Sequence, residues 1–504
     1  MAKVAHNFLA NLGGTTWGIL VAFAVVPFYL KFIGAEGYGL VGFFSVLSAL
    51  LSVFDAGFSG AASRELARSS EADAKRGDEI REMVYVLERL FLGAALAIGM
   101  AVVALAPWIA TRWLNVQDLS AESATHAVRL MGALLALQLP LSLYNGCLLG
   151  LQRHVLLNAV GSGISTVRSV GAVLVLWLVS PTVEAFFLWQ VAAMLASLFI
   201  SRWTVWRLLP GSGTRIRFRL EQVRKIGPFA AEMATTNLLG LILSQLDKAV
   251  LSVLLPLHLF GYYMLAWTLA TVTYRLAGPL FLAILPRMTQ LSSAGEAASA
   301  DSLFQRSGQV MALLVVPFSL FVATFAEEIL LLWTHNPEAA RAGRWVAALL
   351  AIGTMISAIM HVPYATYVAE GRLRPIIAIN VVAILLMVPM LVLLTRSFGA
   401  TGAAASWALL NAGMFIAMVL MARRRIGDER VVRWLVSSAI APVGVCALFF
   451  SGAKGMLGDI DALGSINAIA ILAAIGISAE LLLAAFLPFA RQQIAGVARL
   501  ARRA

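Results

Sequence analysis

The sequence predicts an all-α integral membrane fold with about fourteen transmembrane helices, and two observations support this fold class. Hydrophobic residues make up 60% of the 504-residue chain and charged residues only 13%, whereas a soluble domain carries about 25% charged residues. The apolar residues also form blocks of about 20, which is the length of helix that crosses the ~30 Å hydrocarbon core of a bilayer. Helices are expected because lipid cannot satisfy open backbone groups.

The predicted spans follow one another with short polar segments between them. They lie at residues 9–33, 38–62, 84–107, 125–151, 156–180, 183–204, 227–252, 257–286, 308–332, 344–369, 375–396, 400–422, 434–452 and 466–489. The first apolar block is longer than the apolar region of a secretory signal and leads directly into the second span. We therefore expect it to be retained as a helix.

The basic residues predict the orientation of these spans. If the N-terminus is cytoplasmic, 27 Lys and Arg residues fall on the cytoplasmic side and 6 on the other side. Those six are Lys31, Arg112, Arg341, Arg344, Arg396 and Lys454. Because cytoplasmic loops are enriched in basic residues, both termini are expected to be cytoplasmic. The formal net charge of +12 is then explained mainly by the basic residues that orient the spans in the membrane, and no nucleic-acid partner is expected.

The longest cytoplasmic segment divides the predicted chain into two halves. It contains Pro210-Gly-Ser-Gly213, a composition typical of a linker. We predict an N-terminal lobe at residues 1–204, a linker at 205–226 and a C-terminal lobe at 227–424. Residues 425–504 would add two helices and a basic tail, so that each lobe has six helices.

Three short matches at an offset of about 222 residues indicate that the two halves are repeats. Tyr38-Gly-Leu40 pairs with Phe260-Gly-Tyr262, Pro140-Leu-Ser-Leu-Tyr144 with Pro363-Tyr-Ala-Thr-Tyr367, and Asn158 with Asn380. Both halves begin on the same side, so the repeats would be parallel. Transporters of this plan bind substrate between their repeats.

Charged residues inside the spans are the candidate functional residues. Small and polar residues in the spans are explained equally well by helix packing, but a charge at mid-membrane costs at least ~2.5–3.5 kcal/mol and normally faces a cavity or a partner. Arg168 and Arg275 lie deepest in their predicted spans. Two interpretations remain open for both, an ion pair with Asp55 or Asp247 and a cationic patch for a phosphate-bearing ligand.

The other ionisable residues carry less definite expectations. Adjacent helical residues diverge by about 100°, so Asp247 and Lys248 are expected to face different directions. His361 is a candidate for proton coupling, although a polar core histidine would have the same pattern. The polar stripes that accompany these residues include Asn11 in the first span and Asn145 in the fourth.

No cofactor site or catalytic motif is found in the sequence. A Gly-rich phosphate-binding loop ending in Gly-Lys-Ser/Thr is absent, and no cluster has metal-ligand spacing. Cys147 and Cys446 lie inside apolar blocks and are expected to be packing residues. The chain is therefore expected to be a transporter without a cofactor. A membrane glycosyltransferase or polymerase is disfavoured because such enzymes usually bring a large outer loop or an acidic catalytic motif.

Several segments of the chain carry a family resemblance. These segments are Asn11-Leu-Gly-Gly14, Pro27-Phe-Tyr-Leu-Lys-Phe-Ile-Gly-Ala-Glu-Gly-Tyr-Gly-Leu40, Phe54-Asp-Ala-Gly57, Ser63-Arg-Glu-Leu-Ala67, Ser244-Gln-Leu-Asp-Lys248, Phe260-Gly-Tyr-Tyr263 and Gly399-Ala-Thr-Gly-Ala-Ala404. They resemble the bacterial polysaccharide (O-antigen) flippases of the multidrug/oligosaccharidyl-lipid/polysaccharide exporter superfamily. The resemblance extends over the whole chain in span number and layout.

The resemblance implies a V-shaped pair of six-helix lobes that moves an undecaprenyl-pyrophosphate-linked oligosaccharide across the inner membrane by alternating access. It implies a cationic cavity with Lys31, Arg129, Arg168, Lys248 and Arg275. The polar stripes and deep charges of the spans add the polar or coupling candidates Asn11, Asp55, Asn145, Asp247 and His361. Coupling to H⁺ or Na⁺, and partners such as a polysaccharide polymerase and the chain-length machinery, are further expectations. A lipid II flippase and a multidrug antiporter of the same superfamily remain alternatives.

Overall fold

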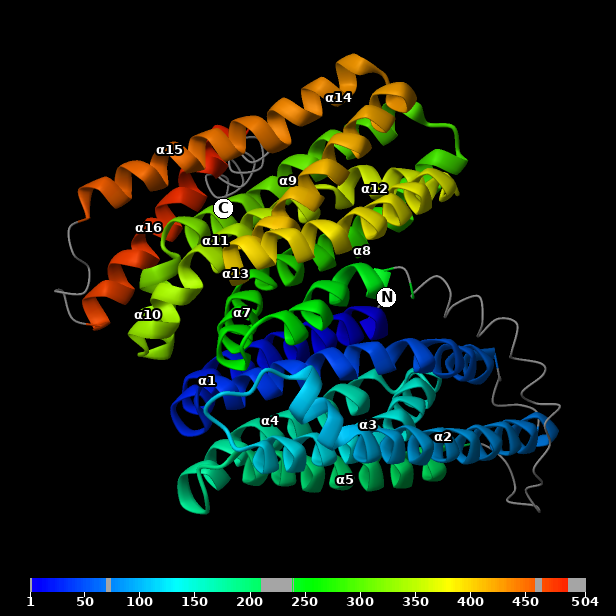
Figure 1. Ribbon diagram of the computed structural model, residues 1–504. Helices are drawn as coiled ribbons and strands as arrows, with labels where there is room; N and C mark the ends of the chain where they lie inside the picture. Colours follow the sequence, from blue (N-terminus) through cyan, green and yellow to red (C-terminus); the bar gives the residue numbers. More distant parts are fainter. Residues whose placement is uncertain (1, 69–73, 210–237, 239, 458–464, 488–504) are drawn as a thin grey trace, which may run out of the picture. The chain divides into compact units, whose positions relative to one another are not determined.

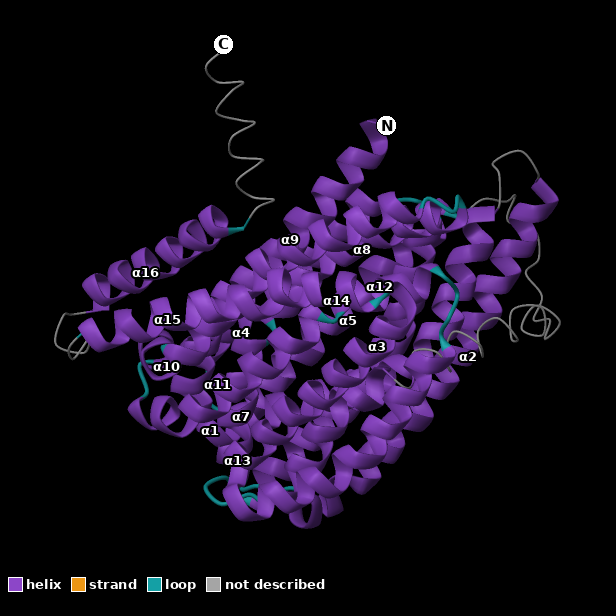
Figure 2. Cartoon of the chain, turned by 90° about the horizontal axis from the view of Figure 1, so that it is seen from above, coloured by secondary structure: helices purple, strands orange, loops and turns teal. Residues whose placement is uncertain are grey.

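The computed structural model describes residues 2–68, 74–209, 238, 240–457 and 465–487 (Figure 1). Within these ranges, the side chains of residues 2–16, 19, 53–56, 74–76, 154, 426 and 465 are outside the description. The described chain is helical, with short connecting loops and one isolated β-bridge between Asn115 and Pro256 (Figure 2). The predicted all-α fold class is therefore confirmed.

The chain forms two compact units, Met1–Gly261 and Tyr262–Ala504. The helices of the first unit are α1 (Ala2–Arg68), α2 (Ala74–Trp108), α3 (Ala121–Gly150), α4 (His154–Leu178), α5 (Val183–Leu208), residues 240–254 and the start of α7 (Leu257–Ala270). A short π-helix, Ile109–Trp113, extends α2. Helix α1 packs against α3 and α4, and α3 packs against α2 and α5.

The second unit contains the rest of α7 and the helices after it. These are α8 (Val272–Ser293), α9 (Ala297–Thr324), α10 (Ala326–Thr334), α11 (Pro337–Ile359), α12 (His361–Ala369), α13 (Arg374–Ile426), α14 (Asp428–Leu435), α15 (Ala441–Met456) and α16 (Ser465–Phe486), with a π-helix at Val436–Ile440. Helix α9 is central in this unit, because α8, α11, α15 and α16 all pack against it.

The described helices account for the predicted number of spans. Eleven segments are long and apolar enough to cross a membrane. Two of them, Leu20–Ser52 and Arg374–Arg425, contain a non-helical glycine, Gly34 (φ 71°) in one and Gly399 (φ 59°) in the other. A positive φ reverses the chain direction at no steric cost only for glycine, so each segment comprises two spans. The remaining predicted span, 227–252, is described from residue 240 onward.

The predicted linker at 205–226 lies mostly outside the described residues, so its role remains a prediction. Residues 240–254, which were expected to open the C-terminal lobe, group by contact with the first unit. Trp113 Nε1 donates to Ser252 Oγ at 2.9 Å, and Leu257 N donates to Asn115 O at 2.9 Å. These contacts tie the residues around 252–257 to the segment that connects α2 to α3.

Two glycines allow α1 and the start of α7 to approach backbone to backbone. A Cβ at Gly39 would lie 2.5 Å from Leu257 O, and a Cβ at Gly261 would overlap Ala35 O. Backbone atoms cannot move aside as a flexible side chain can. The match between Tyr38-Gly-Leu40 and Phe260-Gly-Tyr262 therefore marks two surfaces that contact each other within the first unit.

Gly261→Ala is expected to destabilise the protein by about 1–3 kcal/mol, the usual cost of overpacking a close contact. The thermal midpoint of the purified protein, followed by intrinsic fluorescence in detergent, measures this effect. Gly163→Ala is the matched control, because a Cβ at Gly163 meets open space. Equal midpoints for the two variants would contradict the proposed contact.

Candidate functional site

Arg168 lies near the middle of α4, about 15 Å along the helix axis from the residue at which α4 ends. Its side chain is half-buried. Among the described residues, its guanidinium makes no hydrogen bond or ion pair, and its nearest electrostatic neighbour is the Tyr29 phenol. The ion pair with Asp247 that the sequence left open is not formed, because Asp247 pairs with Lys248. The side chain of Asp55 is outside the described residues.

Three hydrogen bonds, two to backbone carbonyls and one to a side-chain hydroxyl, hold α4 in place around Arg168. Trp189 Nε1 of α5 donates to the carbonyl oxygen of Arg168 at 3.1 Å. From α1, the Tyr29 hydroxyl donates to Ser169 O at 2.9 Å and Trp17 Nε1 donates to Thr166 Oγ1 at 2.8 Å. Because helices on both sides hold this turn, the position of Arg168 is fixed while its guanidinium stays available for an anion.

Two further predicted cavity cations lie on the helices that pack around this site. Lys31 is on α1, one turn before Gly34, and Arg129 is on α3, about 12 Å from the first residue of that helix. Both side chains are exposed, and neither forms an ion pair within the described part of the chain. The structure thus places Lys31, Arg129 and Arg168 on α1, α3 and α4, three helices that contact one another.

The expectation that Asp247 and Lys248 face different directions is wrong. Lys248 Nζ lies 2.9 Å from Asp247 Oδ1 and 3.2 Å from Oδ2, and it donates to Ser244 O at 2.7 Å. Both residues are 1% exposed. Their Cβ atoms do diverge, but the four methylenes of lysine let its ammonium fold back onto the preceding carboxylate. Lys248 therefore lies in the interior of the first unit, and its predicted substrate contact remains a prediction that would require this pair to open.

In the second unit, Arg275 and His361 lie next to interruptions of two packed helices. Helix α7 gives way to α8 around Thr271, and α11 gives way to α12 around Met360. Thr354 Oγ1 of α11 lies 3.4 Å from Ala270 O, so the interruptions are neighbours. Arg275 is exposed and makes no hydrogen bond or ion pair among the described residues. Interrupted membrane helices are a recurrent feature of transporter binding sites.

The interruptions have local causes. In a continuous helix the ring of Pro363 would clash with the carbonyl of Ile359, four residues earlier. The helix is interrupted there, and α11 ends at Ile359. Near the other interruption, the hydroxyls of Thr268 and Thr271 donate to the carbonyls of Met264 and Thr268 at 2.8 and 2.9 Å. Such bonds compete with the helical hydrogen bonds and bend helices.

His361 is held by its own helix and by aromatic rings. Its Nδ1 lies 3.0 Å from Ser357 O and 3.2 Å from Ala358 O. Since carbonyl oxygens only accept hydrogen bonds, Nδ1 carries the hydrogen and Nε2 is the nitrogen that can exchange a proton. The ring centroids of Phe281 and Tyr274 lie 5.5 and 6.4 Å away. The imidazole therefore occupies an aromatic site beside Tyr274, the residue that precedes Arg275.

Of the polar candidates, Asn145 is exposed on α3. The side chains of Asn11 and Asp55 are outside the described residues. Cys147 and Cys446 are buried free thiols, as expected for packing residues. Within the described ranges, no group of three or more His, Cys, Asp or Glu residues could hold a metal ion.

The two units also contain equivalent ion pairs that the matches between the two halves of the sequence did not indicate. In the first unit, Arg202 Nε lies 3.0 Å from Glu88 Oε1, Trp206 Nε1 donates to Oε2 at 2.8 Å, and Tyr144 interacts with both charges. In the second, Arg425 Nε lies 3.0 Å from Glu370 Oε2 beside Tyr367. Tyr144 and Tyr367, and likewise Arg202 and Arg425, are separated by 223 residues.

These two clusters support the predicted repeat. The tyrosine and the arginine keep the common offset, whereas the acidic partner lies on α2 in one unit and directly after α12 in the other. The tyrosines and the arginines could have pointed to the clusters from the sequence, because both follow the offset, whereas the acids do not.

Comparisons with known proteins agree with this architecture. Residues 4–292 match the model of a family described as "Polysaccharide biosynthesis protein", and residues 233–393 match the MatE family. A Shigella flexneri protein named "Putative O-antigen transporter" is 19% identical over 408 residues, which cover 81% of this chain and 94% of that protein.

Two solved structures show the same fold. The lipid II flippase MurJ in an inward closed conformation has a TM-score of 0.71 at 10% identity, covering 97% of this chain and all of MurJ. An inward-facing multidrug resistance MATE family transporter of the MOP superfamily has a TM-score of 0.62 at 15% identity, covering 82% of this chain and 96% of the transporter. The multi-pass membrane fold is thereby confirmed.

The family model covers more than half of the chain, and the family consists of transporters rather than enzymes. The resemblance to the polysaccharide flippases of the multidrug/oligosaccharidyl-lipid/polysaccharide exporter superfamily is confirmed. The chain belongs to the polysaccharide biosynthesis protein family and is a polysaccharide transporter of this superfamily.

Proposed function

We propose that this transporter flips an oligosaccharide linked to undecaprenyl pyrophosphate from the cytoplasmic to the periplasmic leaflet of the bacterial inner membrane. Movement would proceed by alternating access through a cationic cavity, with both termini in the cytoplasm. One observation carries the proposal: Arg168 lies deep in a membrane helix whose surrounding turn is held by hydrogen bonds, and its guanidinium has no counter-charge among the described residues.

An unneutralised arginine at this depth is costly unless it meets an anion. A guanidinium binds phosphate oxygens through two parallel hydrogen bonds, so a pyrophosphate suits Arg168. Lys31 and Arg129 on the adjoining helices, and Arg275 in the second unit, would add contacts at other depths. The cargo would then meet positive charge at more than one point along its path.

A multidrug antiporter that carries cationic compounds would need free acidic groups instead. Asp247 is a deep acid, and Lys248 neutralises it. Within the two lobes, the free deep charges of the described residues include Arg168 and Arg275, and the deep acid Glu480 lies on α16, outside the lobes. The bases in the lobes favour an anionic cargo. A lipid II flippase carries a chemically similar cargo, so a transport assay with defined lipid-linked sugars separates these two functions.

Ion coupling is part of the proposal. His361 offers Nε2 for proton exchange, so H⁺ coupling would act in the second unit, while Na⁺ remains the alternative coupling ion. A polysaccharide polymerase and the chain-length machinery would receive the flipped cargo.

Arg168→Gln is expected to reduce surface polysaccharide to background in cells that lack the native copy of the gene, with lipid-linked precursor accumulating in the cytoplasmic leaflet. Immunoblotting of the polymer, normalised to the amount of transporter in the membrane, measures this. Arg341→Gln, which removes an exposed arginine near the start of α11, is the matched control. Normal polymer in the Arg168 variant would overturn the proposed function.

A further inference from the structure

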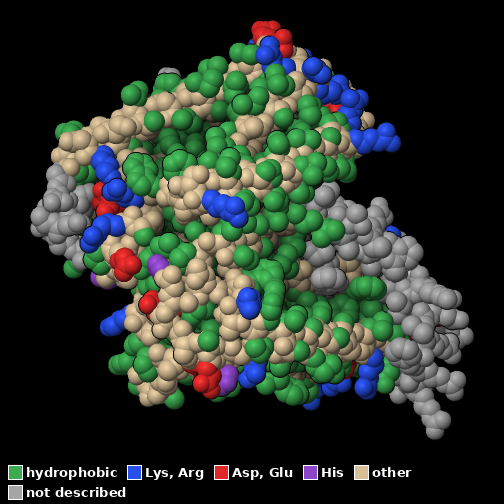
Figure 3. Space-filling view, viewed as in Figure 1, with side chains coloured by type: hydrophobic (Ala, Val, Ile, Leu, Met, Phe, Trp, Pro, Cys, Tyr) green, Lys and Arg blue, Asp and Glu red, His purple; other side chains and the backbone are tan. Residues whose placement is uncertain are grey.

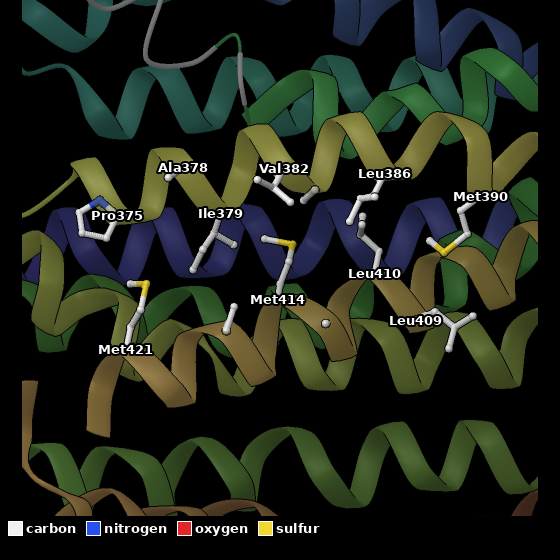
Figure 4. A pocket seen from close by; sticks show the side chains of 13 residues that line it. Pro375, Ala378, Ile379, Val382, Leu386, Met390, Leu409, Leu410, Met414 and Met421 are labelled. Carbon is white, nitrogen blue, oxygen red and sulfur yellow. The ribbon is translucent and has the colours of Figure 1, made fainter. Parts of the chain in front are cut away.

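An apolar groove runs between the two halves of α13, in the second unit (Figure 4). Its volume is about 580 Å³. The lining residues are all apolar, and they are Pro375, Ala378, Ile379, Val382, Ala383, Leu386 and Met390 on one wall and Leu409, Leu410, Gly413, Met414, Ala417 and Met421 on the other. Figure 4 shows side chains of both walls directed into the space between the two halves.

The groove is built to accept a flexible apolar chain. Its floor is firm, because Met414 and Met421 pack against a buried cluster that contains Tyr367 of α12. Its lining includes three methionines, whose unbranched side chains adapt to irregular occupants. At its centre, a Cβ added to Gly413 would meet no protein atom within 4 Å, so the space in front of this glycine is open.

Each wall of the groove ends in an arginine without an ion pair. Arg374 directly precedes Pro375, and Arg424 follows Met421 by one helical turn. Both side chains are exposed, and neither has a hydrogen bond or ion pair among the described residues. Their neighbours Arg425 and Arg423 are instead paired, with Glu370 and Asp428.

This end of the groove is therefore electropositive. Figure 3 shows Lys and Arg side chains gathered where α13 begins and where it passes into α14. Because basic residues are enriched on the cytoplasmic side of membrane proteins, their concentration at this end assigns it to the cytoplasm. A ligand that matches the site has an anionic head and a long apolar chain.

The length of the groove decides which chain fits. From Pro375 to Met390, the wall extends ~22 Å along the helix, whereas half of the hydrocarbon core is only ~15 Å thick. A phospholipid acyl chain that starts at one surface ends near the midplane and leaves the far part of the groove empty. A polyisoprenoid chain is long enough to fill it.

We propose that this groove binds the polyisoprenoid chain of a phosphorylated lipid carrier, with Arg374 and Arg424 contacting the phosphate. The proposal rests on the proposed function, since it assigns a place to the lipid part of the cargo. Held in this way, the chain would stay next to the second unit while the sugar is moved elsewhere in the transporter.

The test is the binding of undecaprenyl phosphate to the purified full-length protein, measured by native mass spectrometry, with phosphatidylglycerol as the comparison lipid. The wild type is expected to bind undecaprenyl phosphate about tenfold more tightly than phosphatidylglycerol. Gly413→Leu should weaken that binding by about tenfold, because its side chain occupies the groove and displaces several buried methylenes. Substituting both arginines, Arg374→Gln with Arg424→Gln, should weaken it by a similar factor.

Gly444→Leu is the matched control, because Gly444 is also an exposed helical glycine with open space at its Cβ; it should bind as the wild type does. Equal binding of the two lipids, or wild-type binding by the Gly413 variant, would overturn the proposal. The outcome is distinguishable from that of the proposed function. If Arg168→Gln blocks polysaccharide export and Gly413→Leu binds undecaprenyl phosphate normally, only the groove assignment fails. If Arg168→Gln exports polysaccharide normally and Gly413→Leu binds undecaprenyl phosphate weakly, only the cationic-cavity function fails.

Discussion

Asp247→Asn is expected to destabilise the protein by about 3–5 kcal/mol, the usual cost of breaking a buried ion pair by removing one partner. The substitution keeps the shape of the side chain but removes the negative charge that lies 2.9 Å from the Lys248 ammonium. That ammonium is 1% exposed, so water cannot replace the lost charge. A similar loss is expected for Lys248→Met, which leaves the carboxylate without its nearest cation.

The double substitution Asp247→Asn with Lys248→Met separates charge from other effects. Replacing a buried ion pair with neutral groups of similar volume is often nearly neutral, so the double variant should regain most of the stability that either single variant loses. Thermal unfolding of the four proteins in detergent, followed by fluorescence, gives the coupling between the two sites. Additive losses in the double variant would show that the pair itself contributes little.

Glu36→Gln is the second substitution with a large expected effect, and we expect a loss of about 3 kcal/mol or more. The Glu36 carboxylate accepts hydrogen bonds from the backbone N–H groups of Gln117, Asp118 and Leu119 at 2.7, 2.9 and 2.8 Å. Glu36 is 3% exposed. An amide would present its own donors to some of these N–H groups, and hydrogen bonds to a charged group contribute about 1.5–3 kcal/mol each.

The effect of Glu36 extends beyond its own contacts. The segment that it holds leads into α3, whose first turn is capped by Ser120, and α3 carries Arg129. Glu36→Gln is therefore expected to lower both the thermal midpoint and the amount of protein in the membrane. Glu122→Gln, an exposed position in the first turn of α3, serves as the control. Similar losses for the two variants would mean that the three hydrogen bonds are not the cause.

The sequence was sufficient to predict the membrane fold, because block length and charge bias are properties of the chain itself. It also indicated Arg168 and Arg275 as deep charges, since mid-span position follows from helical rise alone. It could not predict that Glu36 holds a segment 81 residues away, because that contact depends on tertiary packing. The interruption before His361 had a signal in Pro363, although span ten was predicted as continuous.

The error at Asp247 and Lys248 has a different physical origin. The angular separation of adjacent residues on a helix describes Cβ directions, and it does not limit where a long side chain ends. Predicting where a lysine ammonium lies therefore requires knowledge of the surrounding residues as well as the position of the lysine on the helix.

The turns at Gly34 and Gly399 have a consequence for experiments on intact cells. Each reverses the chain between two spans with a single non-helical residue, so almost no extended backbone protrudes from the membrane there. A protease needs several extended residues to bind a cleavage site, and an inserted epitope needs similar room. External proteolysis and epitope mapping should therefore pass over these two hairpins.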